Sequence, residues 1–127
     1  MQRFLWIGVG GAFGTWTRYL FGIWAGRTLS AVFPFGTLLV NLTGCFLIAF
    51  VLQIATDTLL IGPTLRLALT TGFLGGLTTY SSFNYETTRL FQEGAWGAAS
   101  TSFVATTAGG LIAGLLGLTL AHKLAGI

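Results

Sequence analysis

Four long apolar segments occupy most of this chain and restrict what it can fold into. They run from about Phe4 to Trp24, from about Pro34 to Ile54, from Leu65 to Leu90, and from about Trp96 to Leu120. An α-helix needs roughly 20 apolar residues to cross the hydrocarbon core of a bilayer, and each segment has about that length. The pattern predicts an all-α integral membrane protein with four transmembrane helices, one domain over residues 1–127, and both termini on the same side.

The scarcity of charge excludes a soluble domain of this size. Of the 127 residues, 54% are hydrophobic and 7% are charged, with six Lys or Arg and three Asp or Glu. So few charges cannot cover the surface of a soluble protein, so membrane lipid is the expected surrounding. The net charge of +3 comes from scattered residues and not from a basic stripe, which gives no support for nucleic-acid binding. No nucleophile–base pair or metal-ligand cluster suggests an enzyme.

The third apolar segment contains an unusual stretch, residues 71–87, that interrupts its helical character. Glycines there are expected to loosen the backbone, and hydroxyl side chains can bond their own main chain in competition with the helix. These residues are Gly72, Gly75, Gly76, Thr78, Thr79, Ser81 and Ser82. In a bilayer a break is tolerated only where it is buried in protein or lines a wet cavity, and broken membrane helices tend to hold ions or substrates. The break, with about ten residues on each side of it, is therefore the predicted functional centre.

Two kinds of ion chemistry are available at such a break. Carbonyl groups within residues 75–79 would lose their intrahelical partners and can ligate a hard monovalent cation such as Na⁺. Tyr80 and Phe83 follow on nearly one helix face, and an anion can sit against the positive edges of their rings. Ordinary packing of the two rings is the alternative. Further donors along the way are the Asn41 amide and the hydroxyls of Thr37, Ser81, Ser102 and Thr106.

Three more polar residues lie inside the apolar segments, and each has more than one interpretation. Arg18 can snorkel to an interface, bond carbonyls at a helix end, or take part in ion binding. Asn41, on one face with Thr37, can bond a neighbouring helix or offer an N–H group to an anion. Glu86 is either a buried or an interfacial acid.

The basic residues give almost no preference for one orientation in the membrane. One end of the expected bundle carries Arg3, Arg66 and Lys123, and the other carries Arg27 and Arg89. Because orientation follows an excess of Lys and Arg on the cytoplasmic side, this chain can insert both ways up. The expected assembly is an antiparallel, dual-topology homodimer with a two-fold axis in the membrane plane. Glycine pairs with G-x-x-x-G spacing, such as Gly10 and Gly14, are expected to let helices approach closely.

Three motifs resemble those of the Fluc-type (CrcB) fluoride channels. They are G-x-x-G-G-L-T-T-x-S-S-F from Gly72 to Phe83, G-G-A-x-G-T-x-x-R-Y ending at Tyr19, and G-T-L-x-V-N-x-x-G from Gly36 to Gly44. They occur in the correct order, and the resemblance covers all four segments. One departure is that Tyr80 replaces the family's usual phenylalanine, which keeps a ring edge and adds a hydroxyl.

The resemblance implies a channel that exports toxic fluoride from the cytoplasm by passive electrodiffusion, across the bacterial cell inner (plasma) membrane. It implies an antiparallel dimer with two anion paths and a central structural Na⁺. Gly75 and Thr78 of both subunits would give carbonyls to the Na⁺, and Arg18 would be structural, near a helix end. Phe83 and Tyr80 would flank each path, and Asn41 would offer its amide to the ion. A polar track would comprise Thr37, Ser81, Glu86, Ser102 and Thr106.

Two other classes of membrane protein fit the sequence less well. A small four-helix, dual-topology, proton-coupled exporter needs a titratable carboxylate in its pathway, and Glu86 is the only one in any predicted span. A non-transporting assembly subunit would use the glycine faces to join a larger complex.

Overall fold

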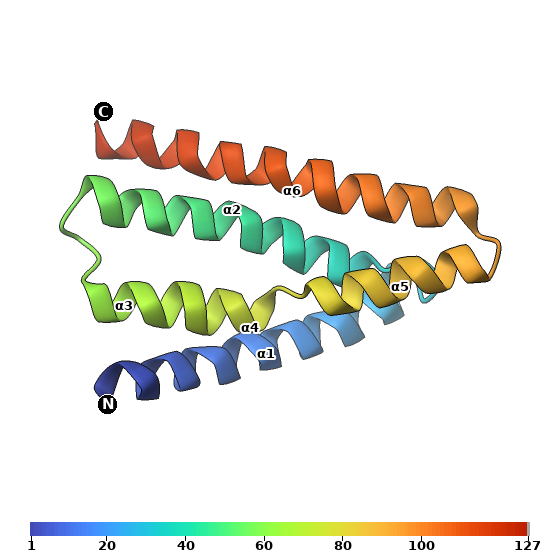
Figure 1. The fold of residues 1–127 in the computed structure, drawn as a ribbon, viewed down its shortest axis with the longest axis horizontal. Coiled ribbons are helices and arrows are strands. Elements are labelled where there is room, and N and C mark those ends of the chain that lie inside the picture. The colour runs from blue at the N-terminus through green and yellow to red at the C-terminus, as the bar shows by residue number, and fades with distance from the viewer. Residues whose placement is uncertain (127) are drawn as a thin grey trace.

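The computed structural model describes residues 1–126, which contain helices and no strand. The helices are α1 (Gln2–Thr28), α2 (Phe35–Asp57), α3 (Pro63–Leu67), the π-helix η1 (Ala68–Leu74), α4 (Gly75–Leu77), α5 (Tyr80–Gln92) and α6 (Trp96–Ala125). They form four rods, because α3, η1, α4 and α5 follow one another as a single interrupted rod (Figure 1). Both termini lie at the same end of the bundle (Figure 1). The expected all-α fold with a broken third helix is confirmed.

The outer surface of the bundle is apolar. Helices α2 and α6, with 23 and 30 residues, are each long and apolar enough to cross a membrane. Large hydrophobic side chains point outward on other helices as well, including Trp16, which is 60% exposed. A surface of this kind is suited to lipid. That all four rods cross the bilayer remains a prediction, since only these two meet the criterion of length and composition.

The ends of the helices differ from the expected boundaries. Helix α2 continues to Asp57, which had been expected in a loop, and Gln53 Nε2 donates to both Asp57 carboxylate oxygens at 2.8 Å. His122 Nδ1 lies 3.1 Å from Asp57 Oδ2, so this histidine joins the ends of α2 and α6. Helix α6 therefore extends beyond Leu120, because its last turn is held against α2.

Helix α1 packs backbone to backbone against the third rod. A Cβ atom placed on Gly10 would overlap Ala68 O, and one on Gly14 would overlap Phe73 O. Only glycine allows so close an approach, as the G-x-x-x-G spacing of Gly10 and Gly14 predicts.

Two glycines of the third rod complete this contact from the opposite side. A Cβ atom on Gly72 would lie 2.8 Å from Ile7 O, and one on Gly76 would lie 2.5 Å from Gly11 O. Gly72 lies in the π-helix η1, which is wider than an α-helix, and Gly76 lies in α4, so neither glycine interrupts the rod. They are small because α1 lies against them, and the unwinding occurs further along the chain.

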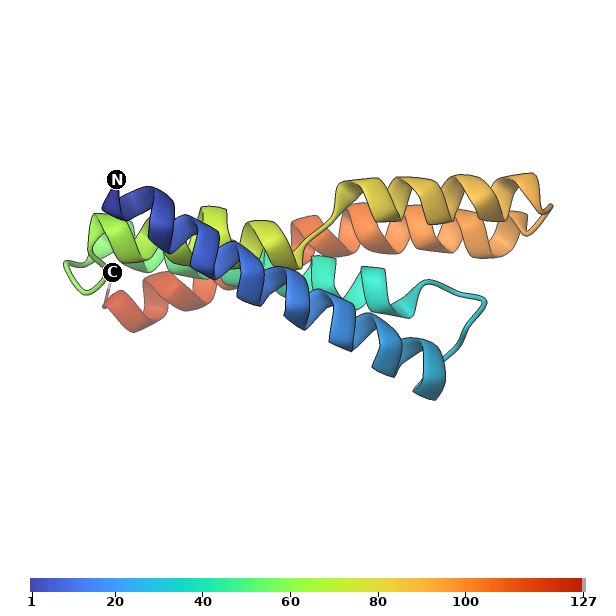
Figure 2. The same cartoon turned by 90° about the horizontal axis from the view of Figure 1, so that it is seen from below.

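Helix α2 lies between the third rod and α6. A Cβ atom on Gly117 would overlap Phe46 O, and one on Gly110 would lie 3.3 Å from Cys45 Sγ. On the other side of α2, the Thr78 methyl group occupies the space that a side chain at Gly44 would need. At the far end from the termini the bundle forks, because the pair α5–α6 diverges from the pair α1–α2 (Figure 2).

Candidate ion site at the helix break

The interruption of the third rod consists of two threonines. Thr78 has φ −85° and ψ 154°, and Thr79 has φ −153° and ψ 115°, so both are extended. Residues 63–77 precede them as a continuous helical run, and α5 begins at Tyr80. The predicted break is therefore present, and its two flanking helical stretches are longer than the ten residues expected for each.

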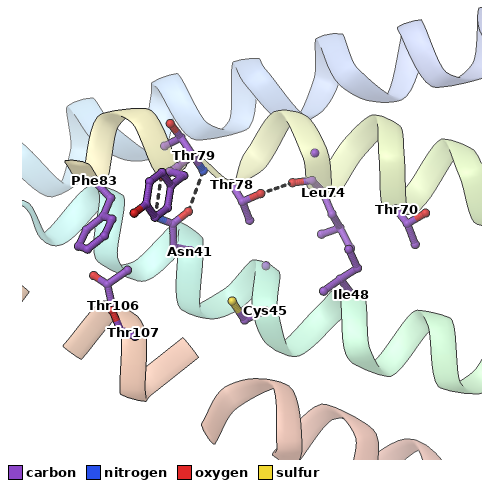
Figure 3. Close-up of a pocket in the computed structure, with 13 residues that line it drawn as sticks. Asn41, Cys45, Ile48, Thr70, Leu74, Thr78, Thr79, Phe83, Thr106 and Thr107 are labelled. Carbon is purple, nitrogen blue, oxygen red and sulfur yellow. Dashed lines mark hydrogen bonds between the residues drawn. The ribbon is translucent and has the colours of Figure 1, made fainter. Parts of the chain in front are cut away.

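Asn41 of α2 holds the break through both main-chain groups of Thr79. Its Nδ2 donates to Thr79 O at 2.9 Å, and its Oδ1 accepts from Thr79 N at 2.7 Å (Figure 3). Asn41 is buried, with 8% of its surface exposed. Of the two interpretations of this residue, the structure shows the bond to a neighbouring helix. The second Nδ2 hydrogen has no acceptor among residues 1–126.

The Thr79 side chain caps the first turn of α5. Its Oγ1 accepts from Ser82 N at 3.2 Å and donates to Ser82 Oγ at 3.1 Å. Ser81 Oγ lies 3.3 Å from the same oxygen. The N-terminal end of a helix carries partial positive charge, so this capped end of α5 favours an anion nearby.

The other side of the break presents carbonyl oxygens. Thr79 N bonds to Asn41, so it does not close a helical turn onto Gly75 O. Within residues 1–126, no hydrogen bond reaches the carbonyl oxygen of Gly75 or Thr78, whereas Gly76 O accepts from Arg18 Nε at 2.9 Å. Arg18 therefore bonds a carbonyl at a helix end, one of the arrangements considered for it. The free carbonyls of Gly75 and Thr78 are the kind of ligand that a hard cation such as Na⁺ takes.

An open cavity of about 400 Å³, here called the break cavity, lies beside these groups. It is bounded by α2, the third rod and α6, and Figure 3 shows the side chain of Phe83 extending from α5 towards Thr106 of α6. Six of the predicted site residues line it: Asn41, Gly75, Thr78, Tyr80, Phe83 and Thr106. The structure thus brings the proposed cation ligands and the aromatic pair together around one space.

The two aromatic side chains meet edge to face but differ in exposure. The Tyr80 and Phe83 ring centroids are 5.6 Å apart with an interplanar angle of 65°. Phe83 is 5% exposed, whereas Tyr80 is 76% exposed in the single chain. Phe103 of α6 stacks on Phe83, with ring centroids 6.4 Å apart. Phe103 was not among the predicted site residues, because nothing in the spacing of residues on α6 relates it to α5.

The predicted polar track is not one continuous chain of hydrogen bonds. Thr37 Oγ1 donates to Glu86 Oε1 at 3.0 Å, between α2 and α5, and Glu86 Oε2 is buried with no partner in the described part of the chain. Ser102 of α6 instead lies 3.0 Å from Thr87, in a separate buried pair. Thr87 was not among the predicted site residues, although its place four residues after Phe83 puts both on one face of α5.

A second cavity of about 350 Å³ lies on the other side of the break, in the fork between α1, α2 and α5. Arg18, Thr37 and Ser82 line it. Thr79 lines both this fork cavity and the break cavity. The two-residue break therefore stands between two hollows, each of which has polar groups in its wall.

Comparison with known proteins shows the family of the chain. The pattern of the family described as "CrcB-like protein, Camphor Resistance (CrcB)" matches residues 5–118. The chain belongs to this CrcB-like family. A relative from Sorangium cellulosum is 48% identical over 124 residues, which are 98% of each chain. A relative from Acidobacterium capsulatum is 40% identical over 97% of this chain and 98% of its own length. A relative from Anaeromyxobacter sp. is 44% identical over 99% of this chain and 100% of its own length. All three are named "Fluoride-specific ion channel FluC". The break, its asparagine and its arginine thus lie in the part of the chain shared with the CrcB-like family.

Proposed function

We propose that the protein is a fluoride-selective channel that exports fluoride from the cytoplasm by passive electrodiffusion. Full-length relatives bearing that name support the proposal. The structural observation that carries it is the Thr78–Thr79 break, where free carbonyls and a capped helix N-terminus meet beside two aromatic rings. A negative-inside potential drives an anion outward by about 2.3 kcal/mol per 100 mV, so no other energy source is needed.

Anion handling at this site relies on donors and ring edges. A small anion entering from the fork loses water and can exchange it for the hydroxyls of Ser81 and Ser82 and the N-terminal end of α5. The Tyr80 and Phe83 ring edges then offer positive partial charge in a narrow, apolar surrounding. These polar contacts continue in two groups: Thr37 of α2 with Glu86 of α5, and Ser102 and Thr106 on α6.

A second, inverted copy completes the assembly in this proposal. Tyr80 is 76% exposed beside the open break cavity, and a partner copy would cover it. The Gly75 and Thr78 carbonyls of one copy are too few to replace the hydration shell of a Na⁺ ion. Two copies related by a two-fold axis in the membrane plane supply twice that number to one central structural Na⁺. Arg18 stays structural, bonded to Gly76 O.

The dimer would be a multi-pass protein of the bacterial inner membrane, surrounded by lipid. The test is fluoride efflux from liposomes loaded with KF and containing the purified protein, started with a potassium ionophore and followed with a fluoride electrode. We expect rapid fluoride release, and no chloride release, read with a chloride electrode, from matched liposomes loaded with KCl. An absence of voltage-driven fluoride release would refute the channel.

A proton-coupled exporter is the second candidate, and one observation favours it. Glu86 carries a buried oxygen, Oε2, without a partner among the described residues. Glu86→Gln keeps the size of the side chain and the bond from Thr37 but removes the titratable proton. An exporter would lose all transport in this variant. We expect fluoride efflux to persist at no less than about a tenth of the original rate, a bound that allows for weakening of the one bond from Thr37.

A further inference from the structure

The pairing of Asn41 with Thr79 has the form of a strand pair made by a side chain. In an antiparallel sheet, an extended residue directs its N–H and C=O to the same side and exchanges both bonds with one opposite residue. Thr79 is extended, and the Asn41 side-chain amide supplies the matching donor and acceptor at 2.9 and 2.7 Å (Figure 3). A helical residue directs these two groups in opposite directions along the axis, so one amide cannot bond both.

This pair of hydrogen bonds therefore selects one backbone conformation for Thr79. If Thr79 became helical, its N–H would return to Gly75 O, four residues earlier, and Asn41 would lose both partners. A buried amide without partners is unfavourable, and Asn41 is 8% exposed. Unwinding at Thr79 and the freedom of the Gly75 carbonyl are thus two consequences of the same pair of bonds.

We propose that Asn41 is a positioning residue that keeps the third helix unwound at Thr79 and so holds the Gly75 carbonyl free for a cation. This role of Asn41 is exerted through Thr79. It is separate from any contact that the second Asn41 Nδ2 hydrogen makes with an anion. The same pairing fixes the Thr79 hydroxyl where it caps α5, which sets the direction of that helix. The cation part of this inference rests on the proposed function, and the conformational part stands on the hydrogen bonds alone.

The first measurement is amide hydrogen exchange by NMR on the full-length protein in detergent micelles, which reports Thr79 N–H directly. Two neutral hydrogen bonds correspond to roughly a 30-fold change in an equilibrium. In Asn41→Ala we expect the Thr79 amide to exchange about 30-fold faster, with α1 amides unchanged. Thr43→Ala is the matched control, because Thr43 is an exposed residue of the same helix, and it should leave Thr79 unaffected. Unchanged protection of Thr79 in Asn41→Ala would overturn the inference.

A second variant separates positioning from mere packing. The carboxyl group of Asn41→Asp has an O–H donor and a carbonyl acceptor when protonated, and only acceptors when ionised. We expect Thr79 protection close to the original at a pH where the acid is protonated. As the acid ionises, the carboxylate still accepts from Thr79 N but repels Thr79 O, so part of the protection should be lost. A packing role would give no such pH profile, so a Thr79 exchange rate in Asn41→Asp that tracks the wild-type protein at every pH would also overturn the inference.

The third measurement connects the break to the cation. Fluoride efflux is recorded from liposomes across a series of Na⁺ concentrations, with N-methylglucamine as the replacement cation. We expect the Na⁺ concentration for half-maximal flux to rise about 30-fold in Asn41→Ala and to stay constant in Thr43→Ala. If Asn41→Ala changed how the flux depends on fluoride concentration but not the Na⁺ concentration for half-maximal flux, Asn41 would act only on the anion, which would contradict the inference. No fluoride flux in the wild-type protein, with Thr79 exchange altered as expected, would refute the channel and leave the conformational role standing.

Discussion

The close contact between α1 and the third rod gives a prediction that can be worked out from distances. A Cβ atom on Gly76 would lie 2.5 Å from Gly11 O and 3.0 Å from both the Thr15 nitrogen and its Oγ1. Non-bonded atoms pack best at about 3.5–4.0 Å, so Gly76→Ala requires the two backbones to separate by roughly 1 Å. Two of the three contacts are main-chain atoms, which cannot rotate away.

The expected cost follows from two opposing terms. Overpacking of this kind typically costs about 1–3 kcal/mol. Replacing a helical glycine with alanine returns up to about 1 kcal/mol through helix propensity. We expect Gly76→Ala to lower the free energy of unfolding by about 1–2 kcal/mol, or roughly five- to thirtyfold in the equilibrium constant, and to weaken the bond from Arg18 to Gly76 O.

The assay is unfolding in mixed micelles as denaturing detergent is added, followed by the fluorescence of the four tryptophans. The control is Gly8→Ala, because a Cβ on Gly8 meets nothing within 4 Å. That variant should be as stable as the original or slightly more stable. If Gly76→Ala unfolded at the same detergent fraction as the Gly8→Ala control, the argument from backbone contact would be wrong.

Three further predictions concern transport by purified protein in liposomes. Phe83→Ile removes the ring edge and the stacking on Phe103, so fluoride efflux should fall at least tenfold. The control is Phe13→Ile, on the exposed face of α1, which should conduct normally. Wild-type efflux in Phe83→Ile would count against ring-edge contacts. Tyr80→Phe should raise the rate about tenfold, because a hydroxyl that bonds a desolvated anion slows its exit, and a rate no higher than wild type would dismiss that role. Removing Na⁺ during purification should separate the dimer or stop the flux; an intact, conducting dimer with no bound cation would rule out the structural ion.

The broken helix could be predicted from the sequence because its signal is local. Glycines and hydroxyls within an apolar segment conflict with a helical backbone, and their position in the chain needs no knowledge of neighbours. The actual break, however, lies at Thr78 and Thr79, because Asn41 takes the hydrogen-bonding groups of Thr79. Gly72 lies in a π-helical stretch and Gly76 in α4, and both are contact positions for α1, which the sequence of the third segment alone does not reveal.

The site residues were predictable as a set, but their partners were not. The resemblance to the fluoride channels implied ion-site roles for Asn41, Thr78 and Phe83, and all three line the break cavity. The pairing of Thr87 with Ser102 depends on how α5 lies against α6, which periodicity within either helix does not encode. Contacts with a second copy depend on the assembly, so the roles of the exposed Tyr80 and of the Na⁺ ligands stay predictions.

The unequal lengths of the rods bear on how the molecule sits in a bilayer. Helix α6 has 30 residues, so at 1.5 Å per residue it is about 45 Å long, against about 35 Å for the 23 residues of α2. A hydrocarbon core of about 30 Å can accommodate α2 with a tilt of about 30°, within the range that membrane helices adopt, whereas hiding all of α6 would need a tilt of about 48°, which lies beyond that range. If α6 crosses the bilayer, one of its ends must rise among the lipid headgroups. The Trp96 end lies beside α5 (Figure 1), and its indole would be well suited to anchor it there.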